Sequence, residues 1–209
     1  MLRLVRVAVA VATLLAIIVQ FRDRAERPTF NPINFFSFFT IESNLLLLVV
    51  FLAMGLSATR VASTAWASLR GAIAVYIATT GLVYATLLSG LEESLAMTLP
   101  WVNVVLHMVT PIAGIVDWLV DPPRERLKLG HVAAWLVFPV AYVAYSVIRG
   151  SRMGWYPYPF LNPGNPPAYG RVALYCVGIA LTIGLIGLAV RTVGNRRAMP
   201  FTARTPSSS

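Results

Sequence analysis

The fold class of this 209-residue chain is decided by one stretch, which reads Phe35-Phe-Ser-Phe-Phe-Thr-Ile-Glu-Ser-Asn-Leu-Leu-Leu-Leu-Val-Val-Phe-Leu-Ala-Met-Gly-Leu56. It carries a single charged residue, Glu42, and it exceeds the roughly 20 residues that a helix needs to cross the hydrocarbon core of a bilayer. Lipid offers no partner for unpaired backbone groups, so such a stretch is expected to be helical. The stretch therefore predicts a transmembrane helix.

The composition extends this interpretation to the whole chain, because 57% of the residues are hydrophobic and only 12% are charged. A soluble domain carries about twice that charged fraction. The sequence thus predicts an all-α integral membrane protein, a six-helix transmembrane bundle over 1–194, followed by a polar, disordered tail over 195–209. The expected spans are 4–21, 35–56, 71–88, 101–120, 131–148 and 172–190.

The basic residues predict the orientation of this bundle. With the N-terminus inside, eleven of the seventeen basic residues fall in the inner segments and six in the outer loops. Membrane proteins carry this excess on the cytoplasmic side, so both termini are expected there. The first span ends without a small-x-small cleavage site, which favours a retained helix over a signal peptide. Abundant alanine, valine, glycine and arginine suggest a bacterial protein, hence one of the bacterial inner membrane.

Several functional classes are excluded at this stage. The net charge of +9 is explained by loop arginines, and no loop combines a dense basic patch with aromatic residues, so no nucleic-acid partner is expected. The lone Cys176 excludes an internal disulfide and a multi-cysteine metal site. The two histidines, His107 and His131, are expected near opposite faces of the membrane, which argues against a shared haem. We therefore expect no cofactor and no metal.

Polar residues within the spans indicate where function lies, because such groups usually face the interior of a bundle. In the span 101–120, at about 100° per residue, the side chains of Asn103, His107, Thr110 and Asp117 fall within a stripe of roughly 80°. This stripe is expected to point inward. Pro111 has no N–H to bond the carbonyl of His107, so a kink is expected beside the histidine.

A second polar face belongs to the span 35–56, where Ser37, Thr40 and Asn44 follow helical spacing. Glu42 lies nearly opposite and is expected to face another helix or to snorkel to the interface. Thr40 lies about 7–8 Å along its helix and His107 about 9 Å along its own, so the two are expected at matching depth. A threonine needs a neighbouring base to act as a nucleophile, and histidine is the usual one.

Other interpretations of these residues stay open. Asn103 could orient the imidazole or donate to an oxyanion. Buried threonine, asparagine and histidine could instead hold helices together without any chemistry. Glu42, His107 and Asp117 could alternatively form a path for ions or protons. The proline-rich segment 149–171 could be a lid over the outer mouth of the bundle or an aromatic anchor at the interface.

Three phrases of the sequence, in this order, resemble the androgen-induced-protein family of multipass membrane proteins, and more closely its bacterial Pr-six-Pr branch. They are Asn34-Phe-Phe-Ser-Phe-Phe-Thr-Ile-Glu-Ser-Asn44, Leu99-Pro-Trp-Val-Asn-Val-Val-Leu-His107 and Trp155-Tyr-Pro-Tyr-Pro-Phe-Leu161. The resemblance implies six spans and hydrolysis of fatty acid esters of hydroxy fatty acids, with Thr40 as nucleophile and His107 as its partner. Asn103 also matches the family pattern, whereas Glu42 and Val104 depart from residues common in it.

The expected function is thus hydrolysis of a lipid-like carboxylic ester within the membrane. Ser37, Asn44, Glu42, Thr110 and Asp117 are expected to support or line the site, together with Asn103. The expected partners are membrane lipids and a lipid-ester substrate. Two rival functions are a lipid-binding or sensory protein without chemistry and a small transporter or channel.

Overall fold

A computed structural model of the chain describes residues 1–57, 63–92, 95, 99–164 and 166–197. All regular secondary structure in these residues is helical. Three elements are short departures from α geometry, namely two π-helical turns (η1 and η2) and one 3₁₀ turn (η3). The elements are α1 (Leu2–Ala25), α2 (Pro32–Phe36), α3 (Phe39–Leu56), α4 (Thr64–Val83), η1 (Tyr84–Leu88), α5 (Pro100–Val104), η2 (Val105–Val109), α6 (Thr110–Val120), α7 (Leu129–Trp135), α8 (Val137–Met153), η3 (Pro159–Leu161) and α9 (Tyr169–Arg197).

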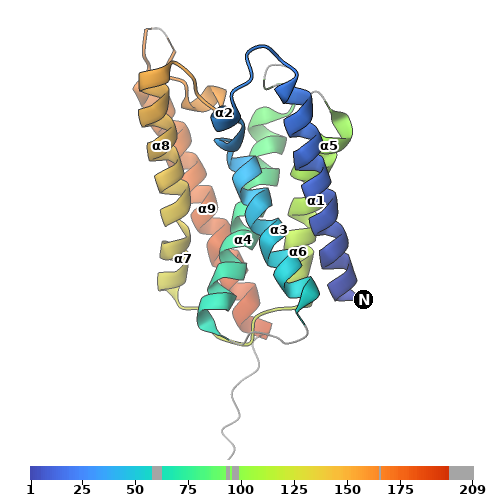
Figure 1. Cartoon of the computed structure of the whole chain (residues 1–209). Coiled ribbons are helices and arrows are strands. Elements are labelled where there is room, and N and C mark those ends of the chain that lie inside the picture. The colour runs from blue at the N-terminus through green and yellow to red at the C-terminus, as the bar shows by residue number, and fades with distance from the viewer. Residues whose placement is uncertain (58–62, 93–94, 96–98, 165, 198–209) are drawn as a thin grey trace, which may run out of the picture.

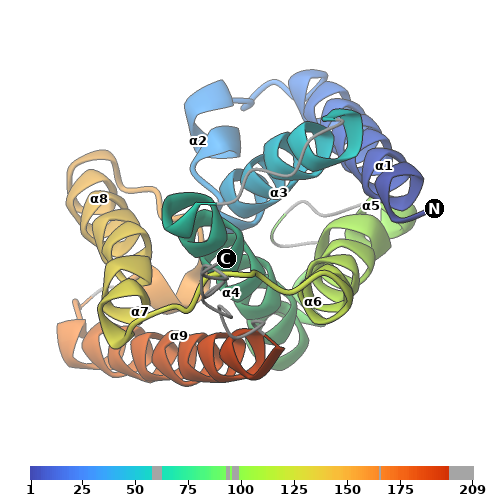
Figure 2. The same ribbon diagram turned by 90° about the horizontal axis from the view of Figure 1, so that it is seen from below.

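The predicted six-helix bundle is confirmed, since six helical stretches are long and apolar enough to cross a membrane. They are Leu2–Ala25, Phe39–Leu56, Thr64–Leu88, Pro100–Val120, Leu129–Met153 and Tyr169–Arg196. The N-terminus and the end of α9 lie at the same end of the bundle (Figure 1). Seen along the bundle, α4 is surrounded by its neighbours and contacts α3, α6, α7 and α9 (Figure 2).

The second predicted span is wrong at its beginning, because it is not one continuous helix from Phe35. Asn31 caps a short helix, α2, by accepting hydrogen bonds from the backbone N–H groups of Ile33 and Asn34. The chain then turns at Ser37 and is extended at Phe38, with φ −83° and ψ 126°. As a result α3 begins at Phe39, and Thr40 lies in its first turn rather than well inside a helix.

The fourth span departs from α geometry where Pro111 predicted a kink. Residues Val105–Val109 form the π-turn η2, closed by a hydrogen bond from the backbone N–H of Thr110 to the carbonyl of Val105. The neighbouring span ends in a second π-turn, η1. Gly81 lets the two spans approach closely, since a Cβ there would lie 2.9 Å from Cβ of Pro111. Such π-turns are rare in proteins and are frequent at functional sites.

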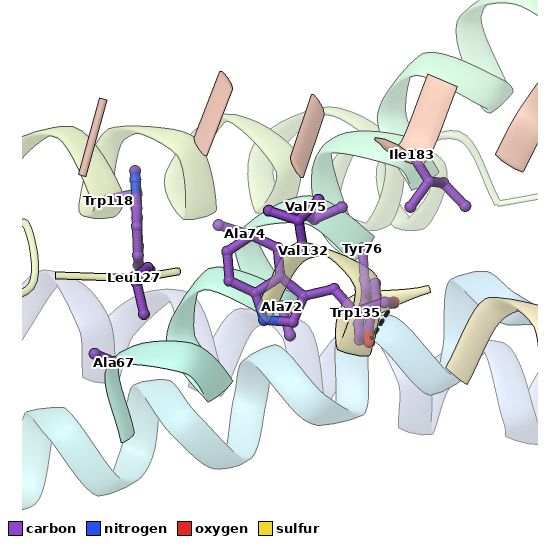
Figure 3. Packing of buried hydrophobic residues seen from close by; sticks show 10 residues of the cluster. All are labelled: Ala67, Ala72, Ala74, Val75, Tyr76, Trp118, Leu127, Val132, Trp135 and Ile183. Atoms are coloured by element: carbon purple, nitrogen blue, oxygen red, sulfur yellow. Dashed lines mark hydrogen bonds between the residues drawn. The ribbon is translucent and has the colours of Figure 1, made fainter. Parts of the chain in front are cut away.

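A hydrophobic cluster packs α4 against its neighbours, and its buried rings are Tyr76, Trp118 and Trp135 (Figure 3). Tyr76 and Trp135 are 6% and 3% exposed, and the hydroxyl of Tyr76 donates to the carbonyl of Trp135 at 2.9 Å. That carbonyl needs a partner because the residue four positions further along, Pro139, has no backbone N–H to donate to it. The indole N–H of Trp118 similarly donates to the carbonyl of Val190 at 3.0 Å. Buried rings with satisfied polar atoms thus fix α4 against α6, α7 and α9.

Four charged side chains are buried together near the N-terminal end of the bundle. Arg6 contacts Asp117 at 2.7 Å and Asp121 at 2.6 Å, and Arg70 contacts the same two carboxylates at 3.2 and 3.7 Å. The four side chains balance in charge and join α1, α4 and α6. Pairing of this kind is what allows ionised groups to lie within a membrane bundle.

The C-terminal boundary differs slightly from the prediction. Helix α9 continues to Arg197, so residues 195–197 are helical rather than part of a disordered tail. The side chain of Asn195 explains part of this extension, because it donates to the carbonyl of Leu127 and accepts from the N–H of the same residue, both at 2.8 Å. The remainder of the predicted tail, 198–209, lies outside the described residues.

Candidate active site

The candidate nucleophile, Thr40, lies in the first turn of α3 and is 8% exposed. Its backbone N–H is among the four that a helix leaves without an intrahelical partner. The N–H groups of Ile41 and Glu42 turn back to the carbonyl of Phe38. The N–H of Thr40 instead donates to the hydroxyl of Tyr158 at 3.3 Å.

His107 lies in η2 and is 5% exposed, and its Nε2 is 3.3 Å from the Oγ1 of Thr40. The structure thus brings together the two residues that matching depth selected, although Thr40 begins its helix instead of lying inside it. The separation is at the long end of a hydrogen bond, which is common for catalytic pairs without bound substrate.

The hydrogen bonds of His107 assign its tautomer. Its Nδ1 lies 3.2 Å from the carbonyl oxygen of Asn103. A carbonyl only accepts, so Nδ1 carries the proton and Nε2 of the neutral ring is left as an acceptor. The hydroxyl of Thr40 therefore donates to Nε2, which is the arrangement a general base requires.

Tyr158 is a site residue that the sequence analysis did not single out, although the surrounding proline-rich segment was noted. The segment folds over the bundle, and Tyr158 is 6% exposed with its hydroxyl 3.4 Å from the Oγ1 of Thr40. Burial raises the pKa of the Tyr158 hydroxyl, so it stays protonated and can donate. Its ring packs edge-on against Phe38, which holds it in place.

The donors around Thr40 form a consistent series. Tyr158 donates to the Oγ1 of Thr40, Thr40 donates to His107, and His107 donates to the carbonyl of Asn103. The backbone N–H of Thr40 adds a further donor at the positive end of the α3 dipole. A backbone N–H and a tyrosine hydroxyl beside one nucleophile are the kind of groups that stabilise an oxyanion.

Three of the predicted supporting residues have structural hydrogen bonds. The Nδ2 of Asn44 donates to the carbonyls of Thr40 and Leu106, at 2.8 and 3.2 Å, and so ties α3 to η2. Ser37 and Thr110 donate to carbonyls of their own turns, and the Oγ of Ser37 also lies 3.2 Å from the hydroxyl of Tyr145. Asn44 therefore positions the pair, whereas Thr110 satisfies its own helix.

The contacts of Asn103 and Glu42 differ from two roles that the sequence analysis considered, a side-chain role for Asn103 and snorkelling for Glu42. Asn103 orients the imidazole of His107 through its backbone carbonyl, and the residue also lines the cavity beside the histidine. Glu42 is half-buried, and its Oε2 is buried without a hydrogen-bond partner. The carboxylate does not snorkel to the interface.

Asp117 is the predicted site residue that the structure places elsewhere. It shares the buried stripe with His107 but lies three turns further along the helix, where Arg6 and Arg70 pair with it. A helical stripe predicts a shared face and says nothing about shared depth. Asp117 therefore belongs to the charged cluster and not to the Thr40 site.

Two cavities meet at the pair, and a third lies beside them. The apolar cavity, of about 60 Å³, lies between α3, α4, α8 and α9, and its lining includes Thr40, Val83, Val143 and Ile183. The histidine cavity, of about 40 Å³, is lined in part by Thr40, His107, Asn103, Gln20 and Arg24. Thr40 lines both cavities, so it lies between the apolar cavity and a second cavity whose lining adds Gln20, Arg24, Asn103 and His107.

The loop cavity, of about 230 Å³, is the third and lies where α1, α2 and the proline-rich segment meet. Its lining includes Arg24, Arg27, Asn34 and Trp155. It shares Arg24, Phe35, Phe38 and Leu95 with the histidine cavity. The three spaces therefore follow one another from the loop, past the pair, to the apolar interior.

Two further residues were missed by the sequence analysis. The ring of Tyr84 in η1 stacks on His107, with centroids 4.2 Å apart, and its hydroxyl donates to Glu92 at 2.8 Å. Backbone N–H groups at Gly90 and Glu92, together with this hydroxyl, lower the pKa of Glu92, so its carboxylate is ionised at neutral pH. No spacing signal connects residues of separate spans, which is why the sequence did not show this contact.

Within the described part of the chain, no group of three or more histidine, cysteine or acidic residues could hold a metal ion. Comparison with protein-family models, with curated proteins and with solved structures gives no match to this chain.

Proposed function

We propose that this chain is a membrane-embedded hydrolase of lipid-like carboxylic esters, with Thr40 as nucleophile and His107 as general base. One observation carries the proposal: the buried Oγ1 of Thr40 lies 3.3 Å from a ring nitrogen whose tautomer makes it an acceptor. Thr40 also lines the apolar cavity, whose hydrocarbon lining suits the acyl side of an ester.

In the first half of the reaction, the Oγ1 of Thr40 attacks the ester carbonyl carbon while the Nε2 of His107 takes the hydroxyl proton. The carbonyl oxygen becomes an oxyanion, which the hydroxyl of Tyr158 and the backbone N–H of Thr40 stabilise. When the tetrahedral species collapses, the bond to the alcohol oxygen breaks. His107 then returns its proton to that oxygen, leaving an acyl-threonine ester and the free alcohol.

In the second half, His107 takes a proton from water as the water oxygen attacks the acyl carbon. The bond to the Oγ1 of Thr40 breaks, and His107 gives the proton back to that oxygen. The products are a carboxylic acid and the original threonine. The Asn103 carbonyl accepts from Nδ1 throughout and so stabilises the imidazolium that forms twice.

The substrate class rests on the cavities and on the family resemblance. The hydrocarbon lining of the apolar cavity suits the acyl side of an ester, and the histidine cavity places Gln20, Asn103 and Arg24 beside the reacting pair. The three phrases that resemble the androgen-induced-protein family contain Thr40, His107 and Tyr158, and that family suggests fatty acid esters of hydroxy fatty acids or similar esters. Such a substrate would reach the site by diffusing within the plane of the membrane.

We also propose that the chain is a multi-pass protein of the bacterial inner membrane with both termini in the cytoplasm. The excess of basic residues at the end of the bundle that contains the N-terminus supports this orientation. Fusion of green fluorescent protein and of alkaline phosphatase to the C-terminus tests it. Fluorescence without phosphatase activity is expected, and the reverse would contradict the orientation.

Of the two rival functions, conduction through Glu42, His107 and Asp117 is disfavoured by the pairing of Asp117 with two arginines. Asp117 also lines a separate cavity with Arg70 and Trp118. A lipid-binding or sensory role would use the same cavities without chemistry. Turnover and covalent labelling separate that role from a hydrolase.

The decisive experiment measures hydrolysis of long-chain esters by the protein purified into lipid nanodiscs. Thr40→Ala and His107→Ala are each expected to abolish turnover. Thr13→Ala is the matched control for the threonine, because Thr13 is also buried and its hydroxyl donates to the carbonyl of Val9 in its own helix. His131→Ala is the control for the histidine, since His131 lies at the start of α7.

Covalent trapping distinguishes a nucleophile from a residue that merely shapes the site. A reaction quenched in acid should contain an acyl group on the peptide that includes Thr40, found by mass spectrometry. Turnover retained in either Thr40→Ala or His107→Ala, or acylation at another residue, would overturn the mechanism.

A further inference from the structure

Arg24 is a charged group that lines both the histidine cavity and the loop cavity, and the proposed mechanism does not use its charge. It lies one turn after Gln20 on α1, and both side chains line the histidine cavity with Thr40 and His107. Arg24 also lines the loop cavity. Its guanidinium therefore stands where the two spaces join.

The hydrogen bonds of Arg24 leave part of its binding capacity unused. One Nη2–H donates to the carbonyl of Leu95. The Nε is buried and has no hydrogen-bond partner. Among the residues that the structure describes, no carboxylate forms an ion pair with Arg24, whereas Arg27, two residues after the end of α1, pairs with Asp23 at 3.0 Å. Buried polar atoms are normally satisfied, so an orphaned N–H on a permanently charged group indicates a missing acceptor.

Aromatic rings fix the orientation of this guanidinium. Its Cζ is 5.1 Å from the ring centroid of Phe38 and 6.0 Å from that of Phe35. Phe38 in turn packs edge-on against Trp155 and Tyr158. The rings hold the charge by cation–π attraction but supply no hydrogen-bond acceptor. The planar fork is therefore pre-organised for an oxyanion.

We propose that Arg24 binds an oxyanion, either a carboxylate or a phosphate, at the head of the lipid whose ester group lies at Thr40. The inference rests on the proposed hydrolase and specifies which esters it selects. The acidic head would lie at Arg24, the scissile carbonyl at Thr40 and His107, and the acyl chain in the apolar cavity. Arg24 would thus be a specificity-determining residue and not part of the proton transfer.

Binding can be measured without turnover, on the Thr40→Ala protein in nanodiscs of dioleoylphosphatidylcholine. The probes are tritiated palmitate and hexadecyl phosphate, with hexadecanol as the neutral analogue, each counted by scintillation proximity against empty nanodiscs. Arg24→Gln should weaken binding of at least one acidic probe by about 10- to 100-fold, because a charge-assisted hydrogen bond is lost. Hexadecanol binding should change less than about twofold, since it makes no such bond.

Two further variants make the result specific. Arg22→Gln removes an exposed arginine of the same turn and should leave all three probes unchanged. Arg24→Lys keeps the charge without the fork and should keep part of the preference for an acidic head. If Arg24→Gln weakens palmitate binding more than hexadecyl phosphate binding, the head is a carboxylate; if the reverse holds, it is a phosphate. Either result supports the proposal.

The proposal is overturned if Arg24→Gln weakens acid and alcohol equally or weakens neither. Should Arg24→Gln fail to fold, equal binding of hexadecanol and both acids by the Thr40→Ala protein overturns it as well. These readouts are independent of catalysis. A chain that hydrolyses nothing but binds acids through Arg24 refutes the Thr40 mechanism alone, and a hydrolase with no preference for acidic heads refutes the role of Arg24 alone.

Discussion

The phenol ring of Tyr84 stacks on the imidazole of His107, with ring centroids 4.2 Å apart and 22° between the ring planes. Both residues lie in π-turns, η1 and η2, at facing positions of two adjacent spans. The stack covers one face of the imidazole, while the carbonyl of Asn103 fixes its Nδ1. Together they leave the ring no freedom except to present Nε2 to Thr40.

The stack predicts a clear difference between two substitutions of Tyr84. Tyr84→Phe keeps the ring and loses only the hydrogen bond to Glu92, so kcat should fall no more than about threefold, whereas Tyr84→Ala should lower kcat about 100-fold because the imidazole loses its orientation. Steady-state hydrolysis in nanodiscs measures both. Equal losses in the two variants would show that the hydroxyl and not the stack matters.

The hydroxyl of Tyr158 is expected to contribute to catalysis directly. Tyr158→Phe keeps the packing against Phe38 but removes the donor 3.4 Å from the Oγ1 of Thr40. We expect kcat to fall about 100-fold with little change in KM, as for the loss of one oxyanion donor. Tyr156→Phe in the same loop is the control and should stay near the parent value. A wild-type kcat in Tyr158→Phe would restrict this loop to a packing role.

Close packing at Gly81 predicts a stability effect that reaches the site. In Gly81→Ala the new Cβ would lie 2.9 Å from Cβ of Pro111 and 3.3 Å from the carbonyl oxygen of His107. Overpacking of this kind costs about 1–3 kcal/mol and should also reduce turnover by moving η2. Gly178→Ala is the control, because no atom lies within 4 Å of its added Cβ. Thermal unfolding in detergent and ester hydrolysis, measured on both variants, test this; a neutral Gly81→Ala would contradict it.

The buried charged cluster predicts a large loss of stability without a direct effect on chemistry. Asp117→Asn removes a partner from Arg6 and Arg70, so it should lower the free energy of unfolding by about 3–5 kcal/mol. Asp23→Asn disrupts the more exposed pair with Arg27, whose side chains are 29% and 39% exposed, and should cost less than about 1 kcal/mol. Melting temperatures of the two variants in detergent make the comparison. A similar loss in both would mean that the cluster does not hold α1, α4 and α6 together.

The polar residues were predictable to different degrees. Burial of Asn103, His107 and Thr110 followed from helical spacing, and all three are at most 8% exposed. The partner of Asp117 did not follow, because Arg6 and Arg70 belong to other spans. Arg24 counted only as a loop charge in the sequence, and its place between two cavities depends on how α1, α2 and the loop pack.

The six membrane-spanning helices could be predicted from the order of residues alone, since hydropathy and the need to satisfy every backbone hydrogen bond in lipid act locally along the chain. That order also placed Thr40 and His107 near one depth. Three contacts required the folded structure: the meeting of these two side chains, the approach of Tyr158 from a loop, and the stacking of Tyr84 on the imidazole. Those contacts depend on the rotation of each helix and on breaks at Phe38 and in the π-turns, which arise from packing between segments far apart in the chain.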